Sequence, residues 1–181
     1  PTDHIWFRSF CKVDNGYWIY TGYNNDDTDN SLLKVDDDFA IIRGQFPQKV
    51  FFRTIIHSTF IQKENEKYFI SPYDNIIYRI YNDSLAPYIR IDFGDKTLPY
   101  EKIATFSDEK EYNKLIEKNN YLGYLGDFLF YRDQLYFTFS SISENSLQYI
   151  ACYDIELNKV NIYDIPIAMI TEQYMEYVNQ M

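Results

Sequence analysis

Residues Tyr68 to Pro99 read "YFISPYDNIIYRIYNDSLAPYIRIDFGDKTLP". The stretch contains three short runs that are rich in aromatic and β-branched residues, and each run ends in turn-forming residues. Such side chains suit a pleated, half-buried surface. Asn82-Asp83 suits an inner turn, because short polar side chains hydrogen-bond their own backbone. The stretch therefore predicts three consecutive antiparallel strands.

The same organisation recurs along the chain. Three segments each predict a strand, a polar turn and a second strand, at offsets of 51 and 67 residues; they are "FCKVDNGYWIYTGY" from Phe10, "IQKENEKYFISPYD" from Ile61 and "FLFYRDQLYFTFSS" from Phe128. The residues that follow these segments align as well, with Val35, Tyr81 and Tyr153 in equivalent places. The repeating unit is thus four antiparallel strands.

A four-stranded unit that recurs about every 50 residues is typical of a β-propeller, in which each unit forms one blade. We therefore predict an all-β fold with blades over roughly 4–47, 57–99 and 124–166. An antiparallel β-sandwich is the alternative. The bias of the composition, with 19 Tyr and 14 Phe, agrees with blades that pack face to face through large side chains.

One insertion and the tail depart from the repeat. "FSDEKEYNKLIEKNN" (106–120) predicts a helix near 107–119, with Ser107 as the N-cap and with Tyr112, Leu115 and Ile116 on one face. The tail, 167–181, has apolar residues at helical spacing, although the first strand of a further blade is also open.

Composition and charge limit the class of partner. The chain of 181 residues is 46% hydrophobic, which is enough for one domain with a core, and its net charge is −10. Because phosphates would be repelled, the charge argues against nucleic acid and against an anionic membrane surface. No apolar span indicates membrane insertion. Cys11 and Cys152 lie in apolar runs without CxxC spacing, so we expect buried small hydrophobes, and a disulfide between them stays open.

The stretch Phe69 to Pro99 resembles the six-bladed β-propeller family of uncharacterised secreted proteins and lipoproteins from Gram-negative gut anaerobes, which are similar in shape to NHL-type propellers. The resemblance rests on "IY-x-I", a polar turn, "P-x-Y-x-I-DFG" and "LP"; "GYWIYTGY" with "LLKVDDD", and "LGDFLFYRDQLYFTF", fit neighbouring blades. It covers roughly 10–165.

The resemblance implies a propeller fold, an extracytoplasmic setting and no established activity, catalytic residue or cofactor. Members of this kind are about twice as long, so the chain corresponds to about half a ring. Either it is a piece of a longer protein, or the missing blades or a second chain complete the ring.

Candidate chemical motifs have simpler structural explanations. Asp92-Phe93-Gly94 matches a kinase tripeptide, but the other kinase motifs are missing, and Gly94 suits an exit turn. Asn24 to Ser31 is rich in oxygen ligands but lacks the EF-hand pattern, which favours a solvated loop. His4 and His57 lie near the starts of first strands without partners for a metal, so we expect polar residues that line a channel or satisfied half-buried histidines.

Two features bear on carbohydrates. Asp127 and Asp133 could supply paired carboxylates for glycoside hydrolysis, or could serve in turns. Aromatic side chains near strand ends could form sugar-binding platforms or pack between blades; these are Trp18, Tyr20, Tyr23, Tyr73 and Tyr124. We therefore expect a binding or scaffolding module for a carbohydrate or protein partner, with a propeller-based carbohydrate hydrolase or lyase as the alternative.

Overall fold

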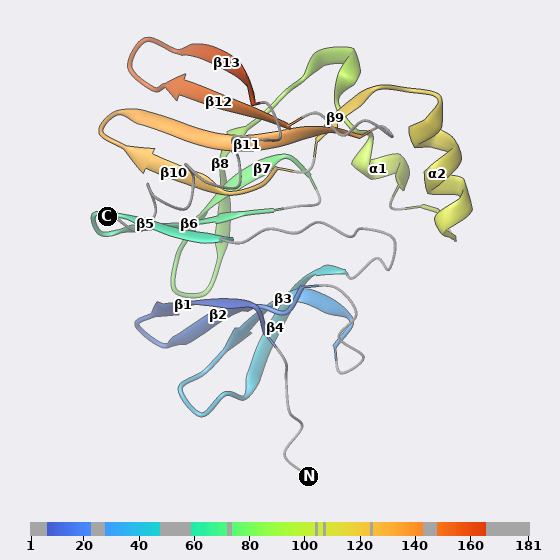
Figure 1. Cartoon of the computed structure of the whole chain (residues 1–181). Coiled ribbons are helices and arrows are strands. Elements are labelled where there is room, and N and C mark those ends of the chain that lie inside the picture. Colours follow the sequence, from blue (N-terminus) through green and yellow to red (C-terminus); the bar gives the residue numbers. More distant parts are fainter. Residues whose placement is uncertain are drawn as a thin grey trace.

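The computed structural model describes residues 7–22, 28–47, 59–71, 74–103, 105–106, 108–123, 125–142 and 148–165. These residues form three antiparallel sheets that stack on one another (Figure 1). Blade 1 contains β1 (Ser9–Val13), β2 (Gly16–Tyr20), β3 (Asn30–Val35) and β4 (Ile41–Pro47). Blade 2 contains β5 (Phe60–Lys63), β6 (Glu66–Ile70), β7 (Ile76–Ile80) and β8 (Leu85–Arg90).

Blade 3 contains β10 (Phe128–Tyr131), β11 (Gln134–Ile142), β12 (Gln148–Asp154) and β13 (Lys159–Ile165), and the short β9 (Tyr121–Gly123) also pairs with β11. In every blade the strands lie side by side in chain order. The first strands of successive blades, β1, β5 and β10, are neighbours. The predicted all-β architecture of four-stranded antiparallel units is therefore confirmed.

The strand register corrects the alignment of the repeat. Each first hairpin closes with a two-residue turn after Val13, Lys63 and Tyr131, which are spaced by 50 and 68 residues rather than 51 and 67. The alignment of the middle unit was therefore one residue out, and Ile80, not Tyr81, occupies the place of Val35 and Tyr153. A slip of one residue matters because alternate side chains point to opposite faces of a sheet.

The core consists of two layers, each between one blade and the next. The layer between blades 1 and 2 contains Val13, Trp18, Tyr20, Leu32, Phe69 and Ile80. The layer between blades 2 and 3 contains Tyr68, Ile70, Ile77, Leu125, Phe128, Leu135, Phe137, Phe139 and Ala151. Phe69 and Tyr68 are adjacent in β6 but point into different layers, so blade 2 is apolar on both faces.

Aromatic rings and a few hydrogen bonds fix the blades against one another. The rings of Tyr68 and Phe130 lie 4.8 Å apart between blades 2 and 3. The indole Nε1 of Trp18 donates to the carbonyl oxygen of Tyr81, 3.2 Å away, between blades 1 and 2. Trp18 is fully buried, and this hydrogen bond satisfies its single polar group.

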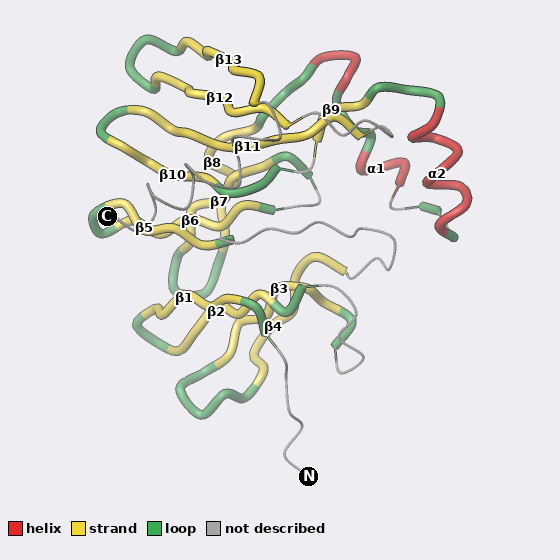
Figure 2. Tube along the Cα trace, viewed as in Figure 1, coloured by secondary structure: helices red, strands yellow, loops and turns green. Residues whose placement is uncertain are grey.

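The helices follow blade 2 in the chain and lie together at one end of the molecule (Figure 2). They are α1 (Tyr100–Ile103) and α2 (Glu109–Glu117), and a short 3-10 helix, Gly94–Lys96, precedes them. The predicted cap Ser107 lies outside the described residues. The carboxylate of Asp108 instead accepts a hydrogen bond from the backbone N–H of Glu111 at 3.0 Å, as an N-cap does. The tail 167–181 also lies outside the described residues.

A pair of leucine substitutions tests the layered core. Leu135 is fully buried between blades 2 and 3, whereas Leu157 is 72% exposed in the turn before β13. We expect Leu135→Ala to lower the free energy of unfolding by about 2–5 kcal/mol, because it leaves a cavity. Leu157→Ala should change it by less than about 0.5 kcal/mol. Urea denaturation of both variants measures the difference, and equal losses would contradict this packing.

Candidate functional site

The meander places the long connections at one edge of the blades. The turns β1–β2, β5–β6 and β10–β11 contain two residues each, and all of them lie at the opposite edge, to the left in Figure 1. The strand ends that lead into the connections β2–β3, β6–β7 and β11–β12, and into the helical segment after β8, lie at the other edge. We call this the connection edge. Binding residues are most often carried by such connecting segments on a rigid scaffold.

Buried polar side chains gather at the connection edge. They are Thr21, Ser31, Thr59, Ser71, Asn75 and Ser141, each within two residues of a strand end on that side. Among the described residues, Lys34 is the exception: its ammonium donates to the carbonyl oxygens of Asn15 and Val35 near the opposite edge. Burial of a polar group costs free energy unless the group is hydrogen-bonded. The recurrence of these side chains at one edge is therefore a structural feature of the blades.

Three equivalent residues lie at the starts of the first strands, at the same edge. Ser9, Thr59 and Asp127 share the same place in the corrected repeat, where the chain enters each blade at the connection edge. The hydroxyls of Ser9 and Thr59 hydrogen-bond to each other across blades 1 and 2. Arg8, the preceding residue, is exposed and its side chain lies against Gly22 instead, while its backbone N–H donates to the carbonyl oxygen of Tyr20 at 2.8 Å. Since β1 neighbours β5 and β5 neighbours β10, Ser9, Thr59 and Asp127 lie at the same end of adjacent strands, and we call these three residues the polar mouth.

A second polar group lies at the same edge of blade 2. The carboxylate of Asp74 accepts hydrogen bonds from the Tyr78 hydroxyl and from the backbone N–H of Ile76. The Tyr100 hydroxyl donates to Oδ1 of Asn75 at 3.0 Å, whereas Nδ2 of Asn75 has no hydrogen-bond partner among the described residues. Burial raises the pKa of Asp74, although the hydrogen bonds that its carboxylate accepts from Tyr78 and Ile76 act to lower it. Burial, and then the Asp74 carboxylate, raise the pKa of Tyr78.

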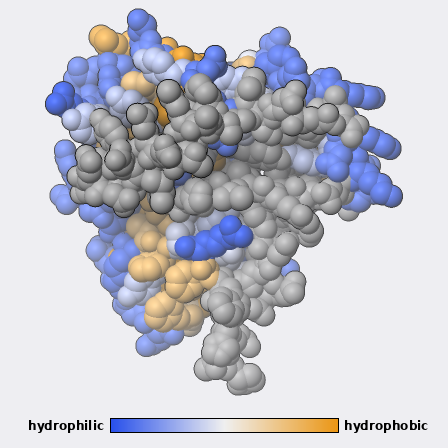
Figure 3. Space-filling view, in the orientation of Figure 1, coloured by the Kyte–Doolittle hydropathy of each residue, from blue (hydrophilic) through white to orange (hydrophobic). Residues whose placement is uncertain are grey.

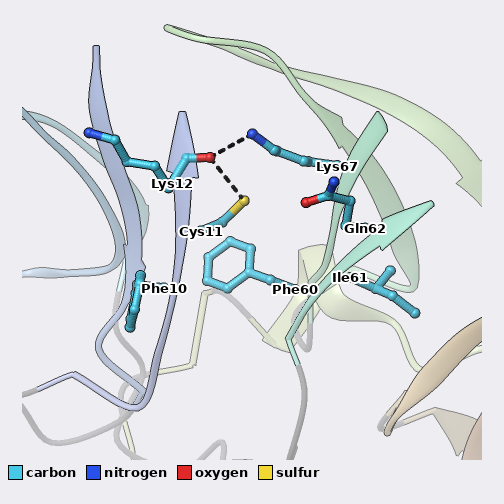
Figure 4. A pocket seen from close by; sticks show the side chains of 7 residues that line it. All are labelled: Phe10, Cys11, Lys12, Phe60, Ile61, Gln62 and Lys67. Atoms are coloured by element: carbon cyan, nitrogen blue, oxygen red, sulfur yellow. Dashed lines mark hydrogen bonds between the residues drawn. The ribbon is translucent and has the colours of Figure 1, made fainter. Parts of the chain in front are cut away.

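A shallow pocket of about 270 Å³ lies on the seam between β1 and β5 (Figure 4). It is lined by Phe10, Cys11, Lys12, Phe60, Ile61, Gln62 and Lys67. The Lys67 ammonium donates to the carbonyl oxygen of Lys12 at 2.7 Å, whereas the Lys12 side chain points away from the pocket toward Asp37. Burial raises the pKa of the Cys11 thiol, so this sulfur is a poor nucleophile near neutral pH. The lining thus suits packing between the blades better than catalysis.

The carboxylate pair suggested by the sequence is not brought together. Asp127 and Asp133 lie at opposite ends of β10, at the connection edge and in the β10–β11 turn. The extended chain from Asp127 to Tyr131 alone spans about 13 Å, at about 3.3 Å for each residue, whereas glycoside hydrolysis needs carboxyl groups within about 10 Å. Among the described residues, no three His, Cys, Asp or Glu side chains lie together as a metal site requires.

The structure also places several of the other residues that the sequence suggested. Trp18 and Tyr20 are buried between blades and are therefore unavailable as sugar platforms. In the DFG stretch, Asp92 accepts hydrogen bonds from the N–H of Gly94 at 2.8 Å and from the Thr97 hydroxyl at 3.1 Å, and Gly94 has a φ of 61°. The exit turn is thus confirmed. His4, His57, Tyr23, Tyr73, Tyr124 and 24–27 lie outside the described residues.

Thr28 to Ser31, the described part of the predicted oxygen-rich loop, is held by local hydrogen bonds. The Thr28 hydroxyl accepts from the backbone N–H of Asn30 at 3.1 Å. Cys11 and Cys152 are both free thiols in different blades, so the disulfide that the sequence left open is not formed. Cys152 is buried and Cys11 is partly buried.

The polar mouth was missed because its residues are far apart in the sequence and differ in type. A repeat aligned at offsets of 50 and 68 would have placed Ser9, Thr59 and Asp127 together.

Comparison with known proteins agrees with the three stacked blades. A family model described as a 6-bladed beta-propeller matches residues 2–180. The chain belongs to this six-bladed β-propeller family. The fold is similar to the crystal structure of a "putative exported protein" from Bacteroides fragilis, with a TM-score of 0.63 and 16% identity. The match covers 87% of this chain and 46% of that protein, so this propeller chain spans about half its length.

No curated protein matches the sequence of this propeller chain. None of its described helices is long and apolar enough to cross a membrane.

The raised pKa of Asp74 gives a prediction for the connection edge. A carboxyl that binds its proton more tightly when folded stabilises the fold as the pH falls from neutral through the raised pKa toward the ordinary value of 3.8. Asp74→Asn removes this effect. The free energy of unfolding of the wild type, relative to Asp74→Asn, should therefore rise on acidification to about pH 4.

Urea denaturation at several pH values measures this difference, with Asp133→Asn as the control for loss of one surface charge. A difference between the wild type and Asp74→Asn that falls on acidification would show that the carboxylate form is the one favoured by folding.

Proposed function

We propose that this propeller chain is an extracytoplasmic binding module that binds a carbohydrate at the polar mouth. The observation that supports the proposal is the position of Ser9, Thr59 and Asp127, which three successive blades present at one edge. The similarity to a protein described as exported supports the extracytoplasmic setting.

The chemistry of the polar mouth suits sugar hydroxyls. Asp127 is an acceptor, and the hydroxyls of Ser9 and Thr59 can both donate and accept. Asp127 and Ser9 are half-buried rather than buried, so a ligand can reach them. Polar groups of this kind fix the orientation of a ligand, while the surrounding scaffold keeps them in place.

The alternative of a carbohydrate hydrolase or lyase has less support. The only pair of carboxylates that the sequence suggested, Asp127 and Asp133, lies at opposite ends of β10, more than about 10 Å apart.

Binding can be tested with two matched double variants. Ser9→Ala with Asp127→Asn changes the polar mouth, and Ser84→Ala with Asp133→Asn makes the same changes in exposed turns at the opposite edge of blades 2 and 3. After a glycan array identifies a ligand, calorimetry should show at least a ten-fold weaker affinity for the first variant, since a hydrogen bond to a charged group contributes about 1.5–3 kcal/mol. The second variant should bind as the wild type does.

Equal affinities of the two variants would exclude the polar mouth as the site. A protein ligand in place of any glycan would overturn the carbohydrate assignment.

A further inference from the structure

The β1–β2 turn of blade 1 contacts the β7–β8 turn of blade 2 at the edge opposite the connection edge. Nδ2 of Asn15 donates to Oδ1 of Asp83 at 2.8 Å. Nδ2 of Asn82 donates to Oδ2 of Asp14 at 3.0 Å. We call these four residues the turn clasp. All four are exposed, and Figure 3 shows a mainly hydrophilic surface at this edge, on the left of the view. The turn clasp is thus a polar contact between two blades that water can reach.

Asn15 is followed by Gly16, and the fold requires a glycine there. Gly16 has a φ of 119°, a conformation that other residues rarely adopt. A Cβ at this position would lie 2.0 Å from the carbonyl oxygen of Val35. The backbone nitrogen that follows the Asn15 carboxamide is therefore not shielded by a side chain of its own residue. In this arrangement a backbone nitrogen can most readily attack the side-chain amide of the preceding asparagine.

A buried ammonium contacts the peptide group between these two residues. Lys34 is 1% exposed, and its Nζ donates to the carbonyl oxygen of Asn15 at 2.6 Å and to that of Val35 at 3.0 Å. The Asn15 carbonyl and the Gly16 nitrogen belong to one peptide group, so negative charge on the nitrogen is shared with this oxygen. A fixed donor stabilises such charge strongly where water is excluded. Lys34 therefore favours loss of the Gly16 proton.

We propose that Asn15 is a modification site, at which the folded chain converts its own asparagine into an acid. The Gly16 N–H loses its proton to water, and the nitrogen attacks Cγ of Asn15. As the new bond between this nitrogen and Cγ forms, the bond from Cγ to Nδ2 breaks. Nδ2 takes one proton from water and leaves as ammonia. Water then opens the resulting cyclic imide at either carbonyl, which yields aspartate or isoaspartate. The inference does not depend on the proposed ligand.

The conversion reverses the sign of the contact between the blades. The Asn15 amide is the donor to Asp83, whereas a carboxylate in its place has no N–H to donate. It also carries the same charge as Asp83, and like charges at this distance repel each other. Isoaspartate, in addition, lengthens the backbone of the turn by one bond. Deamidation therefore loosens blade 1 from blade 2 at this edge.

Mass spectrometry of proteolytic peptides tests the modification, with the folded full chain incubated at mildly alkaline pH. We expect conversion of amide to acid at Asn15, with isoaspartate among the products. Lys34→Met should slow the conversion about ten-fold, as expected for loss of one hydrogen bond to a charged group. Lys34→Arg retains a cation and should react faster than Lys34→Met. Circular dichroism confirms that each variant is folded.

The wild type unfolded in denaturant provides the reference, because it has lost the contact between Lys34 and Asn15. It should react more slowly than the folded chain, and this comparison decides alone if Lys34→Met does not fold. An amide that persists at Asn15 in the folded chain but not in the unfolded chain would overturn the proposal. Equal rates for folded Lys34→Met and the wild type would also overturn it.

The consequence for the blades is tested by urea denaturation. Asn15→Asp reproduces the aspartate product and should shift the midpoint to lower urea. Asn15→Asp combined with Asp83→Asn exchanges donor and acceptor and should restore the midpoint. Leu157→Asp adds one charge in an exposed turn of blade 3 and should match the wild type. Equal midpoints for Asn15→Asp and the double variant would contradict the role of Asp83.

Discussion

The whole structure depends on the contact of one blade face with the next. A four-stranded sheet that is apolar on both faces, as blade 2 is with Phe69 on one side and Tyr68 on the other, cannot be stable in water by itself. Each face must be covered by another sheet, and large aromatic rings fill the space between twisted sheets with few residues. The abundance of Tyr and Phe in the chain thus follows from the stacking of the blades.

The same constraint separates structure from function along each strand. The middle of every blade is occupied by the apolar layers. Two-residue turns close the first hairpin of each blade at one edge, whereas the strands that lead into the helical segment and into the β2–β3, β6–β7 and β11–β12 connections end at the other edge. The buried hydroxyls of Thr59 and Ser71 mark the boundary between the apolar layers and this edge. Among the described residues, the buried polar side chains other than Lys34 therefore lie on one side of the stack.

The sequence predicted the fold well and the candidate site poorly, for a physical reason. Strand periodicity and turn residues are local signals, so the stretch from Tyr68 to Pro99 was sufficient to predict the strands and the turn at Gly94. The register between repeats is not local, and the alignment by polar turn residues was wrong by one residue in blade 2. That slip placed Phe69 beside Trp18, although the equivalent residue is Tyr68, and it separated Thr59 from Ser9 and Asp127.

Ring closure and the polar mouth are connected through the first strands. Since β1, β5 and β10 are neighbours, the residues at their entrances border the axis about which the blades are arranged. Three blades present Ser9, Thr59 and Asp127 along half of that border. These residues differ in type, so each blade contributes a different polar group to the border. A ligand at the mouth therefore meets a hydroxyl at two positions and a carboxyl group at the third, and its specificity depends on their order along the chain.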